Sequence, residues 1–229
     1  MYSYLPHIDA TKLWQIIGAK SWRDLVAYIE SIDKSTYERL GFDRLLTIVL
    51  DCIKRFGFCE GLKILDVGCN TGLFSISMAA LGNTVTGLDN FVIDVQELYD
   101  QIRFPFINKI SARLNLVKQD ILEFCDVDTN VWDIILLLSV AHHWESGYAK
   151  SQTNKYTEAQ ISKVFNKLFT SFRKAIYYEC PLEEPGFPFG YGYHMLQKYV
   201  NNFASYKLYE IEITIGPNGY LRQLLRIER

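Results

Sequence analysis

The fold of this chain is decided by Ile64-Leu65-Asp66-Val67-Gly68-Cys69-Asn70-Thr71-Gly72, in which an apolar strand runs into a glycine-containing turn. Apolar residues recur at helical spacing over 73–80 directly afterwards, so a helix follows the turn. In a parallel sheet such a turn lies at the carboxyl edge of its strand, where α/β proteins bind their ligands. Gly68 and Gly72 let the backbone approach a ligand closely, and Asn70 tolerates a left-handed φ, so the turn needs no third glycine.

Short apolar runs alternate with helical segments after this turn, which is typical of a parallel sheet built from βαβ units. Several runs are almost continuously apolar, as expected of strands buried on both faces. The predicted strands of this part are Leu62–Val67, Thr84–Leu88, Asn115–Lys118, Trp132–Leu138 and Ala175–Tyr178. The predicted helices are Leu73–Leu81, Val92–Gln101, Thr157–Ser171 and Met195–Phe203. A closing hairpin is predicted from Tyr206–Ile215 and Tyr220–Ile227 around Pro217-Asn218-Gly219.

The first 60 residues are predicted to be helical and to cap the main domain of residues 61–229. Ser21-Trp22-Arg23-Asp24 has the pattern of a capping box that opens a helix ending near Ile32. A second helix follows and ends at Gly57. Because no Pro- or Ser-rich linker follows it, we expect the cap to belong to the same domain.

Composition and charge narrow the class of protein. With 229 residues, 49% of them hydrophobic, the chain can bury a large core, and its net charge of −2 gives no general attraction for nucleic acid. No apolar run approaches the roughly 18 residues of a membrane span, and no signal peptide is recognisable at the start, so we expect a soluble cytoplasmic protein. Five cysteines without CxxC spacing predict buried, reduced thiols.

Two acids close the first two strands. Asp66 is placed to meet a cationic group such as an amino group, and Asp89, which lies 21 residues after Gly68, is placed to bind ribose hydroxyls. A dinucleotide site shares the ribose acid but requires G-x-G-x-x-G and would bring its pyrophosphate near the like charge of Asp66, so NAD is the weaker interpretation. Alternatively, the glycines only make a tight turn and both acids cap helices.

The chain resembles the class I S-adenosylmethionine-dependent methyltransferases through the stretch 64–72 and Thr86-Gly87-Leu88-Asp89. The resemblance implies a Rossmann-like, doubly wound α/β fold with a mostly parallel seven-stranded sheet that ends in an antiparallel hairpin. It implies S-adenosyl-L-methionine as cofactor. Asn70 departs from the family pattern, which often has glycine there.

The same resemblance implies the cofactor-binding residues. Asp120 matches an acid that meets the adenine amino group, and Ile121 could flank the ring. The full predicted set is Arg44, Asp66, Gly68, Cys69, Asn70, Thr71, Gly72, Asp89, Asn90, Asp120, Ile121 and Ser139. Arg44 is included through a fainter similarity, to bacterial methyltransferases that modify surface polysaccharides, in which an upstream arginine holds the cofactor carboxylate. Its place on the polar face of a helix is at least equally compatible with solvent exposure.

The fourth strand runs into Ser139-Val140-Ala141-His142-His143-Trp144 at the same edge of the sheet. Methyl transfer to a hydroxyl needs an aligned nucleophile and a base that accepts its proton, and histidine suits this role. Because neighbouring side chains do not easily point the same way, we predict that His142 or His143 is the base while the other packs or caps a helix. A structural or solvated role for both is the alternative.

The segment Glu179–His194, rich in Pro, Gly and aromatic residues, is expected to cover an acceptor pocket or simply to pack on the core. Glu179, Glu183 and Glu184 could bind a metal ion or orient a hydroxyl, but most of the three are expected to be solvated, and no metal site is predicted. Together with Leu138–His143, these glutamates give a faint similarity to bacterial methyltransferases that modify the ends of surface polysaccharides.

Three functions remain open. The first is O-methylation of a small molecule or a glycan, at a sugar hydroxyl or phosphate. The second is methylation of RNA or protein by positioning alone. The third is a non-catalytic subunit that binds S-adenosylmethionine. Oligomeric state cannot be predicted.

Overall fold

Strand β1 (Lys63–Val67) lies inside a seven-stranded sheet in the computed structural model, which describes residues 42–70, 72–90, 112–147, 155–215 and 220–229. Within these residues the strand order is β3-β2-β1-β4-β5-β7-β6. The other strands are β2 (Thr84–Asp89), β3 (Leu114–Lys118), β4 (Trp132–Leu138), β5 (Phe172–Glu183), β6 (Lys207–Ile215) and β7 (Leu221–Glu228).

The sheet is parallel except at its C-terminal end. Strand β1 pairs in parallel with both β2 and β4, β2 with β3, and β4 with β5, whereas β7 runs antiparallel between β5 and β6. The Rossmann-like, doubly wound fold predicted from the sequence is therefore confirmed. The strand order reverses between β1 and β4, and such a switch point opens a crevice at the carboxyl ends of the strands.

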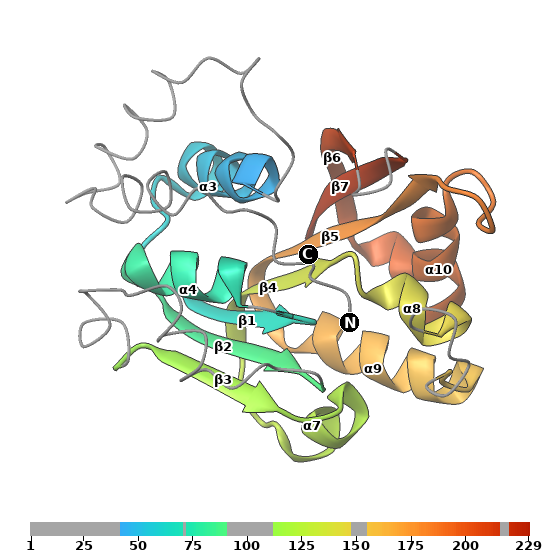
Figure 1. Cartoon of the computed structure of the whole chain (residues 1–229), viewed down its shortest axis with the longest axis horizontal. Helices are drawn as coiled ribbons and strands as arrows, with labels where there is room; N and C mark the ends of the chain where they lie inside the picture. The colour runs from blue at the N-terminus through green and yellow to red at the C-terminus, as the bar shows by residue number, and fades with distance from the viewer. Residues whose placement is uncertain (1–41, 71, 91–111, 148–154, 216–219) are drawn as a thin grey trace, which may run out of the picture.

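Helices cover both faces of the sheet (Figure 1). One face carries α3 (Phe42–Phe56) and α4 (Leu73–Ala80), whose apolar residues share a core with Ile64, Ile134 and Tyr177. The other face carries α7 (Ile121–Val127), α8 (Ala141–Ser146), α9 (Glu158–Thr170) and α10 (Tyr191–Tyr199). A 3₁₀ turn, η3 (Phe203–Ser205), leads from α10 towards β6.

Two predicted elements differ from the structure. Strand β5 runs to Glu183 rather than ending at Tyr178, because β7 continues the antiparallel ladder past Pro181 through a register shift. The predicted helix Met195–Phe203 lies too late in the chain, since α10 begins after Gly190, which has a left-handed φ of 71°, and ends at Tyr199. Helices α7 and α8 were not predicted.

Several predictions fall outside the described residues. They are the helix from Ser21 to Ile32, the helix Val92–Gln101 and the turn at Pro217-Asn218-Gly219. Of the predicted N-terminal cap, the structure describes α3 and the connection that follows it.

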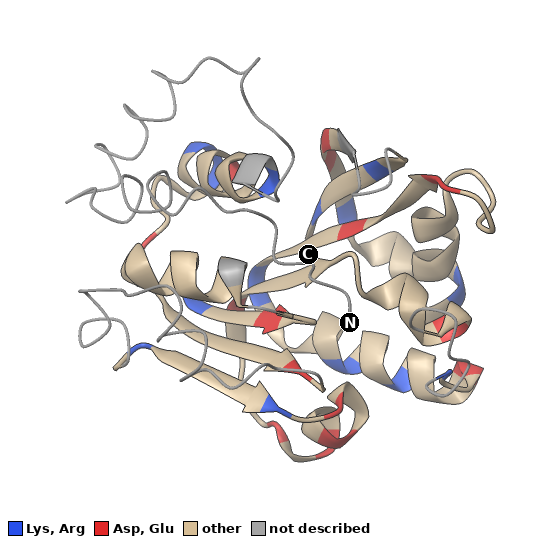
Figure 2. Cartoon of the chain, viewed as in Figure 1, with Lys and Arg blue, Asp and Glu red and all other residues tan. Residues whose placement is uncertain are grey.

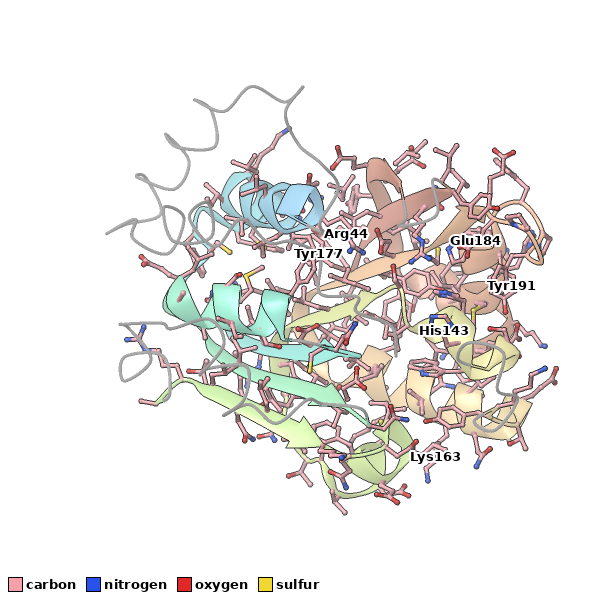
Figure 3. All side chains as sticks on the ribbon, viewed as in Figure 1. Arg44, His143, Lys163, Tyr177, Glu184 and Tyr191 are labelled. Atoms are coloured by element: carbon pink, nitrogen blue, oxygen red, sulfur yellow. The ribbon has the colours of Figure 1, made fainter. Side chains whose placement is uncertain are left out.

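Helix α3 contacts the sheet through its polar face as well as its apolar one. Asp51 accepts hydrogen bonds from Arg226 Nη1 at 2.5 Å and Tyr177 Oη at 2.7 Å, and Arg55 forms a two-point ion pair with Glu228 at 2.8 and 2.9 Å. This face is therefore partly covered, because the antiparallel β7 brings charged partners to it, while the side chain of Arg55 stays 50% exposed. Figure 3 shows Tyr177 on the side of α3 that faces the sheet.

The cysteines and the helices also bear on the expected class. All five cysteines are buried and free of disulfides, as predicted. Among the helices of the described ranges, none is both long and apolar enough to cross a bilayer.

Candidate functional site

The turn after β1 has the backbone that its sequence predicts. Gly68, Asn70 and Gly72 all adopt left-handed conformations, with φ of 74°, 48° and 79°. The N–H groups of Gly68 and Cys69 donate to the carbonyl of Leu88 at 2.7 and 3.1 Å, which ties the turn to β2. Thr71, also predicted to bind the cofactor, lies outside the described residues.

Close packing makes glycine necessary at two positions here. A Cβ on Gly68 would lie 2.6 Å from Cγ2 of Val140, in the segment after β4. A Cβ on Gly87 would lie 2.5 Å from both Ser75 Oγ and Leu116 Cδ2. Glycine thus brings the turn against the end of β4 and α4 against β2.

Asp66 and Asp89 lie on either side of this turn, and Figure 2 shows acidic residues at the ends of β1 and β2. Asp66 is 2% exposed and accepts a hydrogen bond of 2.6 Å from Ser75 Oγ. Burial raises the pKa of its carboxyl to about 6, the Ser75 bond opposes this, and the charge of Asp89 adds to it. Asp89 accepts the backbone N–H of Asn70 at 2.9 Å. Asp66 also interacts with the backbone of Ser75 in the first turn of α4, whereas Asp89 bonds the turn before that helix.

The predicted adenine-side residues lie after β2 and β3. Asn90 is exposed at the end of β2. Asp120 caps α7 by accepting the N–H of Leu122 at 2.8 Å, and it also accepts the hydroxyl of Tyr156 at 2.6 Å, two contacts that sequence reasoning missed. Ile121 is buried in the core on the α9 side of the sheet.

A buried polar cluster joins α3 to the ends of β4 and β5. Glu179 is fully buried and accepts a bond of 2.5 Å from Arg44 Nη1 and another from the hydroxyl of Ser139, which has a φ of 56°. The expectation that Glu179 is solvated is therefore wrong. Its position directly after the apolar run Ala175–Tyr178 was the signal in the sequence for a buried strand end.

The two histidines differ in their surroundings. His142 is 1% exposed, its ring meets Phe187 edge-on at 5.5 Å, and its Nδ1 has no hydrogen-bond partner among the described residues. Burial lowers its pKa to about 2, with smaller effects from His143 and the charge of Arg222. His143 is half-buried, with a pKa lowered by burial and by Arg222, so both rings are neutral at pH 7. His142 packs, as predicted for one of the two rings, but the rings lie against each other with centroids 4.0 Å apart, so the expectation that they point in different directions is wrong.

A cavity of about 620 Å³ opens where β5 ends and β7 begins. It lies in the segment predicted to cover a pocket, at the carboxyl edge of the parallel strands. Its lining combines two acids with apolar and aromatic side chains: Glu183, Glu184, Pro185, Phe187, Phe189, Tyr220 and Leu221. Glu184 is not solvated but pairs with Arg222 at 3.3 Å, and Figure 3 shows Glu184 at this end of the sheet.

Metal binding finds no support in the described part of the chain. There, no three His, Cys, Asp or Glu side chains are grouped closely enough to hold an ion.

Comparisons with known proteins agree with this geometry. Residues 65–156 match the family described as a methyltransferase domain. The chain is 33% identical over 101 residues to the ubiquinone biosynthesis O-methyltransferase of Glaesserella parasuis, which covers 42% of this chain and 40% of that protein. It is 24% identical over 141 residues to the protein of the same name from Escherichia fergusonii, covering 60% of this chain and 52% of that one. The chain thus spans about half the length of these relatives or less.

Solved structures share the fold. Magnesium protoporphyrin IX methyltransferase from Synechocystis PCC 6803, solved with bound SAH, has a TM-score of 0.57 at 15% identity, over 97% of this chain and 94% of that one. The bifunctional kinase-methyltransferase WbdD has a TM-score of 0.56 at 21% identity, over 83% of this chain and 40% of that one. Residues 65–156 thus match a methyltransferase domain, and the sheet order with the turn between Asp66 and Asp89 belongs to a fold shared with a methyltransferase solved with bound SAH.

Proposed function

We propose that this chain methylates an oxygen of a small molecule. The observation that carries the proposal is the meeting, at one edge of the sheet, of the cofactor turn, the half-buried His143 and the partly aromatic cavity at the end of β5. Two relatives named as O-methyltransferases support transfer to oxygen rather than to carbon or nitrogen.

The residues around the turn fit the cofactor. A buried carboxylate, Asp66, suits the ammonium of its methionine part, and the carboxylate of Asp89 at the end of β2 suits a ribose hydroxyl. The left-handed φ of Gly68, Asn70 and Gly72 brings the backbone of the turn close to the same place, while their N–H groups donate to acceptors within the protein. Arg44, linked to Ser139 through Glu179, is proposed to face the cofactor carboxylate, and Asn90, Asp120 and Ile121 the adenosine.

His143 is the proposed base, and His142 supports it by packing. When bound, S-adenosylmethionine supplies a methyl group whose carbon–sulfur bond breaks as the acceptor oxygen attacks the carbon. The neutral imidazole of His143 takes the hydroxyl proton, which the buried ring of His142 is less able to reach. The rate should therefore fall as His143 becomes protonated, below the ordinary histidine pKa of about 6.5.

A glycan is the second acceptor class that we consider. The aromatic side chains of the cavity, Phe187, Phe189 and Tyr220, can stack on a sugar ring as well as on an aromatic one. RNA is disfavoured, since the net charge is −2 and Figure 2 shows Lys and Arg spread over several elements.

Calorimetric titration with S-adenosylmethionine, S-adenosylhomocysteine and NADH tests the cofactor assignment. We expect the two adenosyl ligands to bind and NADH not to, with binding weakened in Asp89→Ala. Turnover is then measured on phenols and sugars. We expect His143→Ala to lose about a hundredfold or more of the rate without loss of cofactor affinity. His194→Ala, at an exposed position of α10, is the matched control, and equal rates for the two variants would reject the base.

A further inference from the structure

Arg222 is a buried cation that the proposed methyl transfer does not yet use. Its side chain is 11% exposed, and it follows Leu221, which lines the cavity. Its carboxylate partner is Glu184, also a lining residue, at 3.3 Å. Its Nε is buried and, among the described residues, has no hydrogen-bond partner. A guanidinium has five N–H donors, and buried donors are nearly always paired, so this one has capacity for a further acceptor.

Two other arginines, Arg44 of α3 and Arg226 of β7, form shorter ion pairs than Arg222 does. Arg44 has Glu179 at 2.5 Å and Arg226 has Asp51 at 2.5 Å. The contact of Arg222 with Glu184 is longer, and the described residues give the planar fork of the guanidinium no two-point partner. Arg222 is therefore the cation of this edge best able to bind an added anion.

Arg222 also acts on the proposed base through its charge. The guanidinium lowers the pKa of both His142 and His143. His142 carries the second buried unpartnered atom of this region, Nδ1, and its ring contacts Phe187 of the cavity. Arg222 thus contacts the wall of the cavity through Glu184, and His142 contacts it through Phe187.

We propose that Arg222 binds an anionic oxygen group, a carboxylate or phosphate, on an aromatic acceptor whose hydroxyl is methylated. This rests on the proposed function, and it narrows the acceptor to a hydroxylated aromatic acid. The acceptor ring packs on Phe187, Phe189 and Tyr220. Arg222 holds the anion through its fork, a geometry for which lysine is a poor replacement. Glu184 competes with the acceptor for the same guanidinium.

Equilibrium binding of 4-hydroxybenzoate to the full chain, saturated with S-adenosylhomocysteine, tests this. We expect Arg222→Gln to weaken binding about tenfold or more, because it removes a charged hydrogen bond. Arg222→Lys should weaken binding less, because it keeps the charge and loses only the fork geometry of the guanidinium. Phenol, which has no anionic group, should bind the unchanged chain and Arg222→Gln equally weakly. 4-Hydroxyphenyl phosphate, compared with the benzoate, decides between phosphate and carboxylate.

Two variants keep the test decisive. Glu184→Gln removes the competing carboxylate and should tighten 4-hydroxybenzoate binding on the order of threefold. Arg173→Gln, an exposed arginine at the other end of β5, should change nothing. Absence of 4-hydroxybenzoate binding, or an affinity unchanged in both Arg222→Gln and Glu184→Gln, overturns the proposal. Absence of S-adenosylhomocysteine binding instead rejects the proposed function.

Discussion

Asp66 carries an ionisation that the cofactor can control. Its carboxyl is buried and its pKa is about 6, so it is largely protonated at pH 5 and largely ionised at pH 7. If it binds the ammonium of S-adenosylmethionine, only the ionised form is useful, and affinity should rise with pH from 5 to 7, by up to about tenfold per unit. Calorimetry in buffers of different ionisation enthalpy should detect proton release at pH 5.5. Asp66→Asn should flatten the profile, and a flat wild-type profile would contradict the assignment.

Without ligand, a rise in pH has the opposite effect at Asp66: it lowers the stability of the fold. Because the folded pKa of about 6 lies above the unfolded value of about 3.9, the folded state binds more protons between these values. Stability from this group is therefore present at low pH and lost as pH rises from about 4 to 6. Cofactor binding offsets that loss.

Gly68 combines two constraints that can be separated by substitution. Gly68→Ala adds left-handed strain and a Cβ only 2.6 Å from Val140 Cγ2, whereas Gly57→Ala, at φ 82°, adds strain but meets no atom within 4 Å. We expect Gly57→Ala to cost about 1–2 kcal/mol of unfolding free energy and Gly68→Ala at least about 1 kcal/mol more. Urea unfolding measures both, and equal losses would mean that the clash relaxes freely.

Sequence spacing predicted the local part of the site but not its long-range contacts. Asn70 and the two acids follow from positions within one βαβ unit, where chain order and spatial order agree. Glu179 pairs with Arg44, which lies 135 residues away in the chain, and Arg222 pairs with Glu184, 38 residues away. No local sequence pattern encodes such pairs.

Element boundaries show the same division. Strand β4 and helix α9 are close to their predicted limits because apolar periodicity and the Thr157 capping box define them. Strand β5 extends beyond its apolar run since its last residues are stabilised by β7, which lies far along the chain. Helix α7 begins at an Asp120 cap whose signal is a single residue and was interpreted as a cofactor contact.

The attachment of α3 to the sheet can be tested at Asp51, on the polar face of this helix. Asp51→Ala removes the partner of the largely buried Arg226 and the acceptor of the Tyr177 hydroxyl. Glu228 still faces Arg226, so we expect a loss of about 2 kcal/mol rather than the larger cost of an isolated buried charge. Lys163→Ala breaks an ion pair with Asp126 whose side chains are 53% and 55% exposed, and it should cost under about 0.5 kcal/mol. If Asp51→Ala lost as little unfolding free energy as Lys163→Ala in urea, the polar face of α3 would not stabilise the fold.

At the scale of the whole molecule, the doubly wound order explains why one edge collects the chemistry. Strands β1, β2, β4 and β5 are parallel, so their carboxyl ends all open to the same side. The antiparallel β7 enters at that side and brings Arg222 to it. The fold buries these polar groups at the site. The cost of burying them should appear in the pH dependence of the free energy of unfolding.

Acid stability of the molecule should depend on His142. Its folded pKa of about 2 lies below the unfolded value of about 6.5, so the unfolded chain binds one more proton between these pH values. Stability from this group is fully present above pH 6.5 and falls as pH drops, by up to about 1.4 kcal/mol per unit. We expect His142→Leu to flatten the decline between pH 7 and 5, whereas His194→Gln, at an exposed site that stays in water on folding, should keep the wild-type slope. Urea unfolding at several pH values measures it. Equal slopes in all three proteins would mean that His142 gains water or a partner when it is protonated.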